Sequence, residues 1–209
     1  MTQAYDYGIA SINFYNVKNT IEKWHETPNE NSLEQYQLAK NSAEIANDYH
    51  PKNALYVDML AQVYEWGVIY EYEEAQQGLS KAKELYLNAA ELRPLWPVTW
   101  ASLVMIKWRQ QQFDDEMLYF LKQADFLGPQ KPEVNIVYVE LGLALYSNNH
   151  PLLFEIRETF YQRLTKGLSS SYSRKRVIEI IKQYKAERYV CRWLRNESAQ
   201  VRSFIPRCK

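Results

Sequence analysis

An internal repeat marked by prolines constrains the fold of this chain more than any other feature. Pro51, Pro94 and Pro129 are each preceded, five residues earlier, by an alanine. Further small residues stand earlier in the first two of these segments, and the alanines of the pattern are Ala39, Ala46, Ala82, Ala89 and Ala124. Small residues at fixed positions allow two antiparallel helices to approach closely. Proline ends one helix and is well placed to start the next, so the pattern predicts consecutive helix pairs.

The residues after each proline complete the pattern. Val57, Leu60 and Tyr64 follow Pro51 at the same offsets at which Trp100, Leu103 and Lys107 follow Pro94. Over residues 33–150 this arrangement resembles the tetratricopeptide repeat. The resemblance implies an all-α, right-handed solenoid of antiparallel helix pairs, ended by a C-terminal capping helix that solvates the last pair.

We therefore expect one helical-repeat domain over residues 1–209. It would comprise an N-terminal helix within 1–32, repeat helix pairs over 33–166, and a basic cap helix and tail over 167–209. The stretch "RPLWPVTW" reads as a repeat junction, with Pro97 in the first turn of a helix. The first repeat is longer than usual, which predicts two elongated helices that meet near Gln77 and Gly78. A single long helix is expected from about 174 to 195.

Charge is distributed unevenly although the net charge is zero. Residues 157–209 carry 14 Lys and Arg against 4 Asp and Glu, and the rest of the chain carries 11 against 21. The basic end is either a solvated helix face or a contact surface for an acidic polymer such as an acidic polysaccharide. Nucleic acid is not expected as a partner. The candidate basic patch consists of Arg174, Lys175, Arg176, Lys182 and Lys185.

The two cysteines, Cys191 and Cys208, leave two interpretations open. They are two unrelated thiols of a cytosolic protein, or they form a disulfide that clips the tail in an oxidising compartment. No apolar run approaches the ~20 residues that a membrane-spanning helix needs, and no signal peptide is visible. Membrane contact is expected only through an anchor outside this sequence.

The sequence offers no catalytic constellation. Its three histidines form no paired ligand set, and nucleophile elbows, phosphate-binding glycine loops and zinc-type cysteine spacings are missing. We therefore expect a protein that is not an enzyme and that binds no metal or cofactor.

The tetratricopeptide resemblance also implies where a partner would bind. In that family the concave groove is lined by fixed positions of the first helix of each pair. Two tryptophans among these positions could stack on a peptide or on sugar rings, or could equally pack against neighbouring helices. The candidate groove residues are Asp58, Gln62, Glu65, Trp66, Met105, Trp108, Arg109 and Glu140.

A longer run resembles a more specific family over about residues 85–209. This run resembles the VpsP-like polysaccharide biosynthesis proteins, which are bacterial envelope proteins from exopolysaccharide clusters. The resemblance implies an N-terminal membrane anchor and a non-cytoplasmic body, and it brings no catalytic residues. The matching residues are Arg93, Pro94, Trp96, Pro97, Trp100, Asp114, Gly128, Pro129, Pro132, Glu133, Val134, Leu141, Gly142 and Leu143.

Three hypotheses on function follow. The first is a non-enzymatic scaffold or interaction protein of a bacterial surface polysaccharide synthesis or export system, on the periplasmic side of the inner membrane, with protein partners from that machinery. The second is a cytosolic peptide-binding adaptor that uses the same groove. The third is a module that binds an acidic glycan through the basic C-terminal helix or the aromatic groove.

Overall fold

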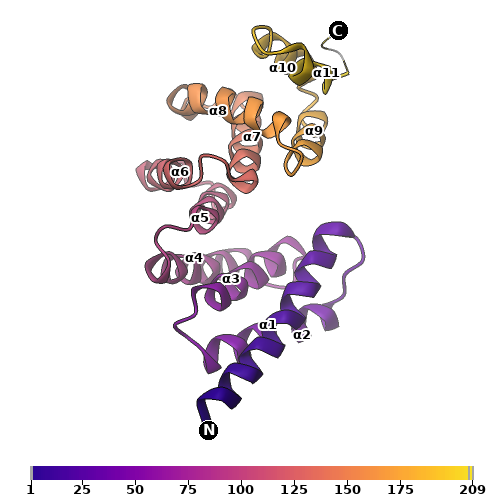
Figure 1. Ribbon diagram of the computed structural model, residues 1–209. Helices are drawn as coiled ribbons and strands as arrows, with labels where there is room; N and C mark the ends of the chain where they lie inside the picture. Colours follow the sequence, from indigo (N-terminus) through magenta and orange to yellow (C-terminus); the bar gives the residue numbers. More distant parts are fainter. Residues whose placement is uncertain (1, 207, 209) are drawn as a thin grey trace. The chain divides into compact units, whose positions relative to one another are not determined.

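The computed structural model describes residues 2–206 and 208, and for residues 2 and 3 it describes the backbone alone. The described residues form helices and no strands, so the prediction of an all-α protein is confirmed (Figure 1). The chain divides into two compact units, Met1–Gln112 and Phe113–Lys209. The expected single repeat domain stays a prediction.

Five helices make up the described part of the first unit. In this unit α1 packs against both α2 and α3, α3 packs against α4, and α4 packs against α5. The core contains Val57 of α3 and Tyr86 of α4, which are both fully buried. The helices are α1 (Thr2–Glu26), α2 (Leu33–Tyr49), α3 (Ala54–Ile69), α4 (Ala75–Leu92) and α5 (Pro97–Arg109).

The described residues of the second unit form six helices, and three of these are short. Here α7 packs against α8 and α9, α10 contacts α9, and α11 contacts α8. Phe160 and Leu164 of α8 and Val177 of α9 are fully buried in its core. The helices are α6 (Asp115–Leu127), α7 (Pro132–Ser147), α8 (Leu152–Ser169), α9 (Arg174–Gln183), α10 (Glu187–Trp193) and α11 (Ala199–Ser203).

The repeat prolines lie in three junctions of the same conformation. Helices α2, α4 and α6 end at a residue with φ between −147° and −119° and ψ between 54° and 69°, and the proline follows directly. The carbonyl of that last residue accepts a hydrogen bond from the residue three positions later, which makes a turn with proline at its second position. The next helix then begins at Ala54, Pro97 or Pro132. The interpretation of "RPLWPVTW" as a helix junction is therefore confirmed.

Side chains of the junction support this turn. The indole Nε1 of Trp100 donates to the Pro94 carbonyl at 2.8 Å. The Arg93 guanidinium lies over the Trp96 ring, 4.4 Å from its centroid. The alanines of the repeat pattern are buried as the packing argument requires, each with 4% exposure or less: Ala39, Ala46, Ala82, Ala89 and Ala124.

The four helices α3, α5, α7 and α9 share a second kind of end. After each, one residue other than glycine has a positive φ of 50° to 60°, and backbone N–H groups return to the third and second last helical carbonyls. This is the Schellman motif, in which the left-handed position usually carries glycine. The left-handed residues are Glu71, Gln111, Asn149 and Lys185.

Two helix boundaries predicted from the sequence are wrong. The elongated helices meet at Tyr70–Glu74 rather than near Gln77 and Gly78, because the Schellman turn at Glu71 ends α3 and the Glu74 carboxylate caps α4. The expected helix over 174–195 is interrupted at Lys185, which allows Ala186 and Val190 to reach the core.

Candidate functional site

The predicted groove residue Asp58 lies inside the first unit, between α3 and α5. Its side chain is 4% exposed. One carboxylate oxygen accepts a hydrogen bond of 2.6 Å from Thr99 Oγ1, and the other accepts one of 2.9 Å from Gln62 Nε2. Burial raises the pKa of Asp58, and the two hydrogen bonds oppose that effect only in part. The Thr99 bond thus joins α3 to α5, whereas the Gln62 bond lies within α3.

Glu65 and Arg109 come together although they are far apart in the sequence. The Arg109 Nε atom lies 3.1 Å from Glu65 Oε1. Tyr86 donates its hydroxyl to Glu65 Oε2 at 2.9 Å. Because burial, followed by the charge of Glu65, raises the pKa of Tyr86, this hydroxyl keeps its proton. Glu65 of α3 therefore contacts α4 through Tyr86 and α5 through Arg109, at a partly exposed edge of the unit.

Trp66 belongs to an aromatic cluster at the end of α1 and α3. Its ring stacks on Tyr70 with centroids 5.2 Å apart, and it lies 5.9 Å from Trp24 and 5.0 Å from His25. Trp24 is fully buried. These are packing contacts between helices. Met105 and Trp108, the other groove candidates of this unit, are partly exposed on α5.

In the second unit, Glu140 of α7 faces α9. Its carboxylate lies 3.6 Å from a guanidinium nitrogen of Arg176, which also approaches Glu179 at 3.7 Å. The rest of the candidate basic patch divides into two kinds of residue. Arg174 donates to the carbonyls of Leu168 and Ser169, so it fastens the end of α8. The exposed members are Lys175, Lys182 and Lys185.

The structure joins Cys191 of α10 to Cys208 by a disulfide, with 5.1 Å between the Cα atoms. The bond holds the chain after α11 against α10. Trp193, two residues after Cys191, packs its ring against Tyr146 at 4.9 Å and Phe160 at 5.6 Å. The disulfide therefore fixes the helix that carries one side of a nearby pocket.

This pocket, which we call the tyrosine pocket, lies where α7 ends and α9 turns into α10. Its volume is about 270 Å³. Buried Leu143 and Ala186 supply its apolar part, and tyrosines from three different elements supply its aromatic part. Sequence reasoning missed it because it depends on the break at Lys185. The lining residues are Leu143, Tyr146, Ser147, Asn149, Tyr184, Ala186 and Tyr189.

Two hydroxyls of the tyrosine pocket, those of Tyr146 and Tyr184, stay protonated at neutral pH. Burial, and after it the neighbouring Tyr189, raises the pKa of Tyr146, whereas the positive charge of Arg192 acts in the opposite direction. Burial and the charge of Glu140 raise the pKa of Tyr184. The hydroxyls of Tyr146 and Tyr184 can therefore donate and accept a hydrogen bond.

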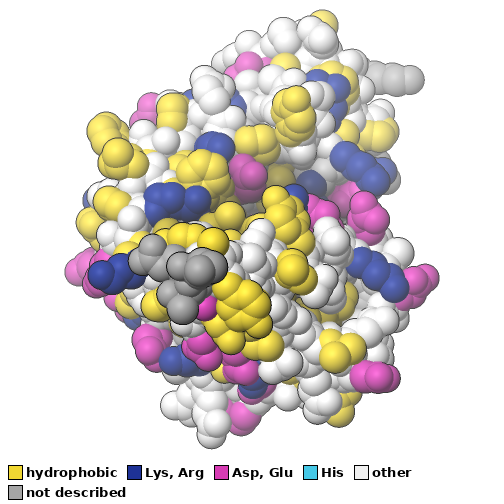
Figure 2. Space-filling view, turned by 60° about the horizontal axis from the view of Figure 1, so that its bottom comes forward, with side chains coloured by type: hydrophobic (Ala, Val, Ile, Leu, Met, Phe, Trp, Pro, Cys, Tyr) yellow, Lys and Arg dark blue, Asp and Glu magenta, His cyan; other side chains and the backbone are white. Residues whose placement is uncertain are grey.

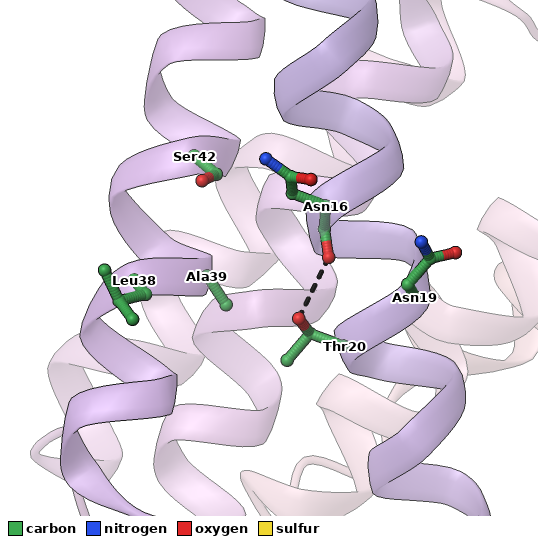
Figure 3. A pocket seen from close by; sticks show the side chains of 6 residues that line it. All are labelled: Asn16, Asn19, Thr20, Leu38, Ala39 and Ser42. Atoms are coloured by element: carbon green, nitrogen blue, oxygen red, sulfur yellow. Dashed lines mark hydrogen bonds between the residues drawn. The ribbon is translucent and has the colours of Figure 1, made fainter.

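Two other depressions have a different character. One is a notch of about 380 Å³ between α1 and α2. Figure 3 shows its lining, which comprises Asn16, Asn19 and Thr20 of α1 and Leu38, Ala39 and Ser42 of α2. The Thr20 hydroxyl is occupied by the Asn16 carbonyl at 2.9 Å. The second depression, of about 560 Å³, lies beside exposed Tyr172 in the second unit. Neither lining contains a paired acid and base.

Exposed hydrophobic side chains gather on the first two helices. Figure 2, with the N-terminal end turned forward, shows hydrophobic side chains at the surface among acidic ones. Four of the exposed hydrophobic residues belong to α1 and three to α2. They are Tyr5, Tyr7, Ile12, Tyr15, Leu33, Leu38 and Tyr49.

Within residues 2–206 and 208, no group of three or more His, Cys, Asp or Glu side chains is placed to hold a metal ion. Among the helices of these residues, none combines the length and the apolar character that crossing a membrane requires. Comparison with known proteins found no family model and no curated protein that matches the chain.

Proposed function

We propose that the protein is a non-enzymatic helical-repeat scaffold or interaction protein of a bacterial surface polysaccharide synthesis or export system. The observation that carries the scaffold part is the repeated junction at Pro51, Pro94 and Pro129. A chain that repeats one connection between helices builds a long surface from similar units, and such surfaces commonly serve in binding. The resemblance over residues 85–209 supports the polysaccharide system.

The finer part of the proposal is a tetratricopeptide-like, right-handed solenoid. The alternation of two kinds of helix end from α2 to α7 supports it, because α3, α5 and α7 end in a Schellman motif and α2, α4 and α6 end directly before a repeat proline. Small-angle X-ray scattering of the full chain tests this. A solenoid gives a radius of gyration larger than the ~17 Å expected for a compact globule of this length.

A location on the periplasmic side of the inner membrane is the second part of the proposal. The Cys191–Cys208 bond supports it, since disulfides persist in oxidising compartments and are rare in the cytosol. The test is the mass of the protein isolated without reductant, with and without alkylation. A mass two hydrogens below that of the reduced chain, without alkylation, supports the location. Two alkylated thiols would instead place the protein in the cytosol.

The proposed partners are proteins of the same machinery. Deletion of the encoding gene is expected to lower the amount of polysaccharide at the cell surface, and a copy of the gene to restore it. Unchanged polysaccharide in the deletion strain would remove the pathway from the proposal. It would bring forward a cytosolic peptide-binding adaptor, for which partly exposed Trp66, Met105 and Trp108 would supply the contact surface.

A further inference from the structure

The tyrosine pocket presents two kinds of surface at once. Tyr146 comes from α7, Tyr184 from the end of α9 and Tyr189 from α10, so three elements converge on it. The Tyr146 and Tyr189 rings lie 5.1 Å apart at 60° to each other. The rings offer apolar faces with a negative quadrupole, and the tyrosine hydroxyls offer hydrogen bonds. Ser147 and Asn149 add polar groups to the rim.

The backbone around the pocket is held in an uncommon conformation at two places. Asn149, which lines the pocket, has φ 50°, and Lys185, between the lining residues Tyr184 and Ala186, also has φ 50°. These are the left-handed positions of the Schellman ends of α7 and α9, so the turns that end these two helices also bound the pocket. The turn at Lys185 positions Tyr184 and, three residues after Ala186, Tyr189.

The charge around the pocket is positive. Lys185 is exposed beside it, and Arg192 is close enough to lower the pKa of Tyr146. The second unit carries 16 Lys and Arg against 11 Asp and Glu. Of the acids on α7, α9 and α10, Glu140 and Glu179 both approach Arg176. Glu133 and Glu187 lie in the first turns of α7 and α10, where the helix dipole favours a carboxylate.

The size of the pocket limits what it can hold. A volume of about 270 Å³ corresponds to roughly nine water molecules and lies just below the range of drug-sized ligand sites. A peptide side chain with its backbone needs an extended groove, which this pocket does not provide. A single six-membered sugar ring has an apolar C–H face and a rim of hydroxyls, and it matches both surfaces of the pocket.

We propose that the tyrosine pocket binds one uronic acid residue of an acidic polysaccharide. The sugar ring packs on Tyr189 and Tyr184, the pocket hydroxyls bond its hydroxyl groups, and Lys185 with Arg192 faces its carboxylate. The identity of the natural polymer rests on the function proposed above, whereas the site itself rests on the geometry of α7, α9 and α10.

The test is a calorimetric titration of the full oxidised chain with alginate oligosaccharides, whose residues are all uronic acids, and with dextran oligosaccharides as the neutral control. Binding of alginate is expected, with an affinity that falls as salt is added because the carboxylate contact is partly exposed. Dextran is expected to bind at least several-fold more weakly. Equal binding of the two would overturn the acidic part of the proposal.

Two variants and one matched control locate the site. Tyr189→Ala removes a ring that is 42% exposed, so the fold should be retained, and it should weaken alginate binding about tenfold. Tyr184→Phe keeps the ring and removes one hydroxyl, and it should weaken binding about threefold. Tyr172→Ala removes an exposed tyrosine of the same unit beside the other depression, and it should leave binding unchanged.

Wild-type affinity in Tyr189→Ala, or loss of binding in Tyr172→Ala alone, would overturn the assignment to the tyrosine pocket. Failure of the wild-type chain to bind either sugar polymer would also overturn it, while the scaffold function would still be judged by the gene deletion. Two free thiols in the isolated protein would contradict the envelope location. The sugar titration would still test binding in the tyrosine pocket, because it does not depend on location.

Discussion

Thr99 of α5 donates a hydrogen bond of 2.6 Å to Asp58 of α3, and both side chains are buried. The two residues are 41 positions apart in the sequence. Asp58 lies shortly after the start of α3 at Ala54, and Thr99 lies shortly after the start of α5 at Pro97. The bond therefore connects corresponding turns of two helices that begin after repeat junctions. Asp58, which the repeat resemblance assigns to a partner-binding groove, is thus a buried hydrogen-bond acceptor inside the first unit.

Replacement of Thr99 by valine should destabilise the first unit. Valine has nearly the same shape but no hydroxyl, so the buried Asp58 carboxylate loses a donor. The free energy of unfolding should fall by about 1–3 kcal/mol, measured by urea denaturation followed by circular dichroism. Thr20→Val is the control, because the Thr20 hydroxyl bonds only its own helix and is partly exposed. A loss no larger than that of the control would contradict the role of the Thr99 bond.

The raised pKa of Asp58 predicts a pH dependence of stability. Burial favours the protonated carboxyl in the native state, so its stabilising contribution is complete below the unfolded value of 3.8 and is lost as the pH rises through the folded pKa. Asp58→Asn removes this proton equilibrium. The stability of the variant relative to the wild type should therefore increase with pH above 3.8, measured by urea denaturation at a series of pH values. A constant difference would show that the pKa of Asp58 is not raised.

The repeat was readable from the sequence because its signals are local. Proline at the second position of a turn and alanine at a close helix contact act through the residue itself, so the junctions at Pro51, Pro94 and Pro129 could be placed. The ends of α3 and α9 could not, because their left-handed residues are Glu71 and Lys185. Glycine is the usual residue at such a position. The turn at Lys185 is explained only by the burial of Ala186, which is a tertiary contact.

The candidate site depended still more on tertiary structure. Glu65 and Arg109 were both singled out from the sequence, but nothing in it showed that they pair with each other and with Tyr86. The tyrosine pocket could not be predicted at all, since Tyr146 and Tyr189 approach each other only after α9 has turned into α10.

Substitution of Gly142 by alanine should destabilise the second unit. A Cβ atom at Gly142 would overlap the Phe160 ring, which is fully buried and has no room to move. Overpacking of this kind costs about 1–3 kcal/mol. Gly8→Ala is the matched control, because a Cβ atom there meets nothing within 4 Å, and alanine in a helix should stabilise α1 by about 0.8–1 kcal/mol. Thermal denaturation of both variants measures the difference, and a neutral Gly142→Ala would contradict the close packing of α7 on α8.

Lys185→Gly should stabilise the second unit, since glycine adopts the left-handed conformation at little steric cost. The gain expected is about 0.5–1 kcal/mol. Lys182→Gly is the control with the opposite sign: it makes the same chemical change inside α9, where glycine costs about 0.5–1 kcal/mol. Both lysines are exposed, so the loss of charge is matched. Equal destabilisation by the two variants in thermal denaturation would show that Lys185 does not interrupt the helix.

Reduction of the Cys191–Cys208 bond should loosen one part of the chain selectively. The bond closes a loop between residues 17 positions apart, for which the chain-entropy account gives about 3 kcal/mol. Hydrogen–deuterium exchange with and without reductant should show faster exchange in α10 and α11, where Val190 and Val201 reach the core, and unchanged exchange in α1 to α5. Cys191→Ser/Cys208→Ser controls for effects of the reductant. Since the disulfide fixes α10 with Tyr189, reduction should also weaken alginate binding, and full affinity in the reduced chain would show that the pocket forms without the bond.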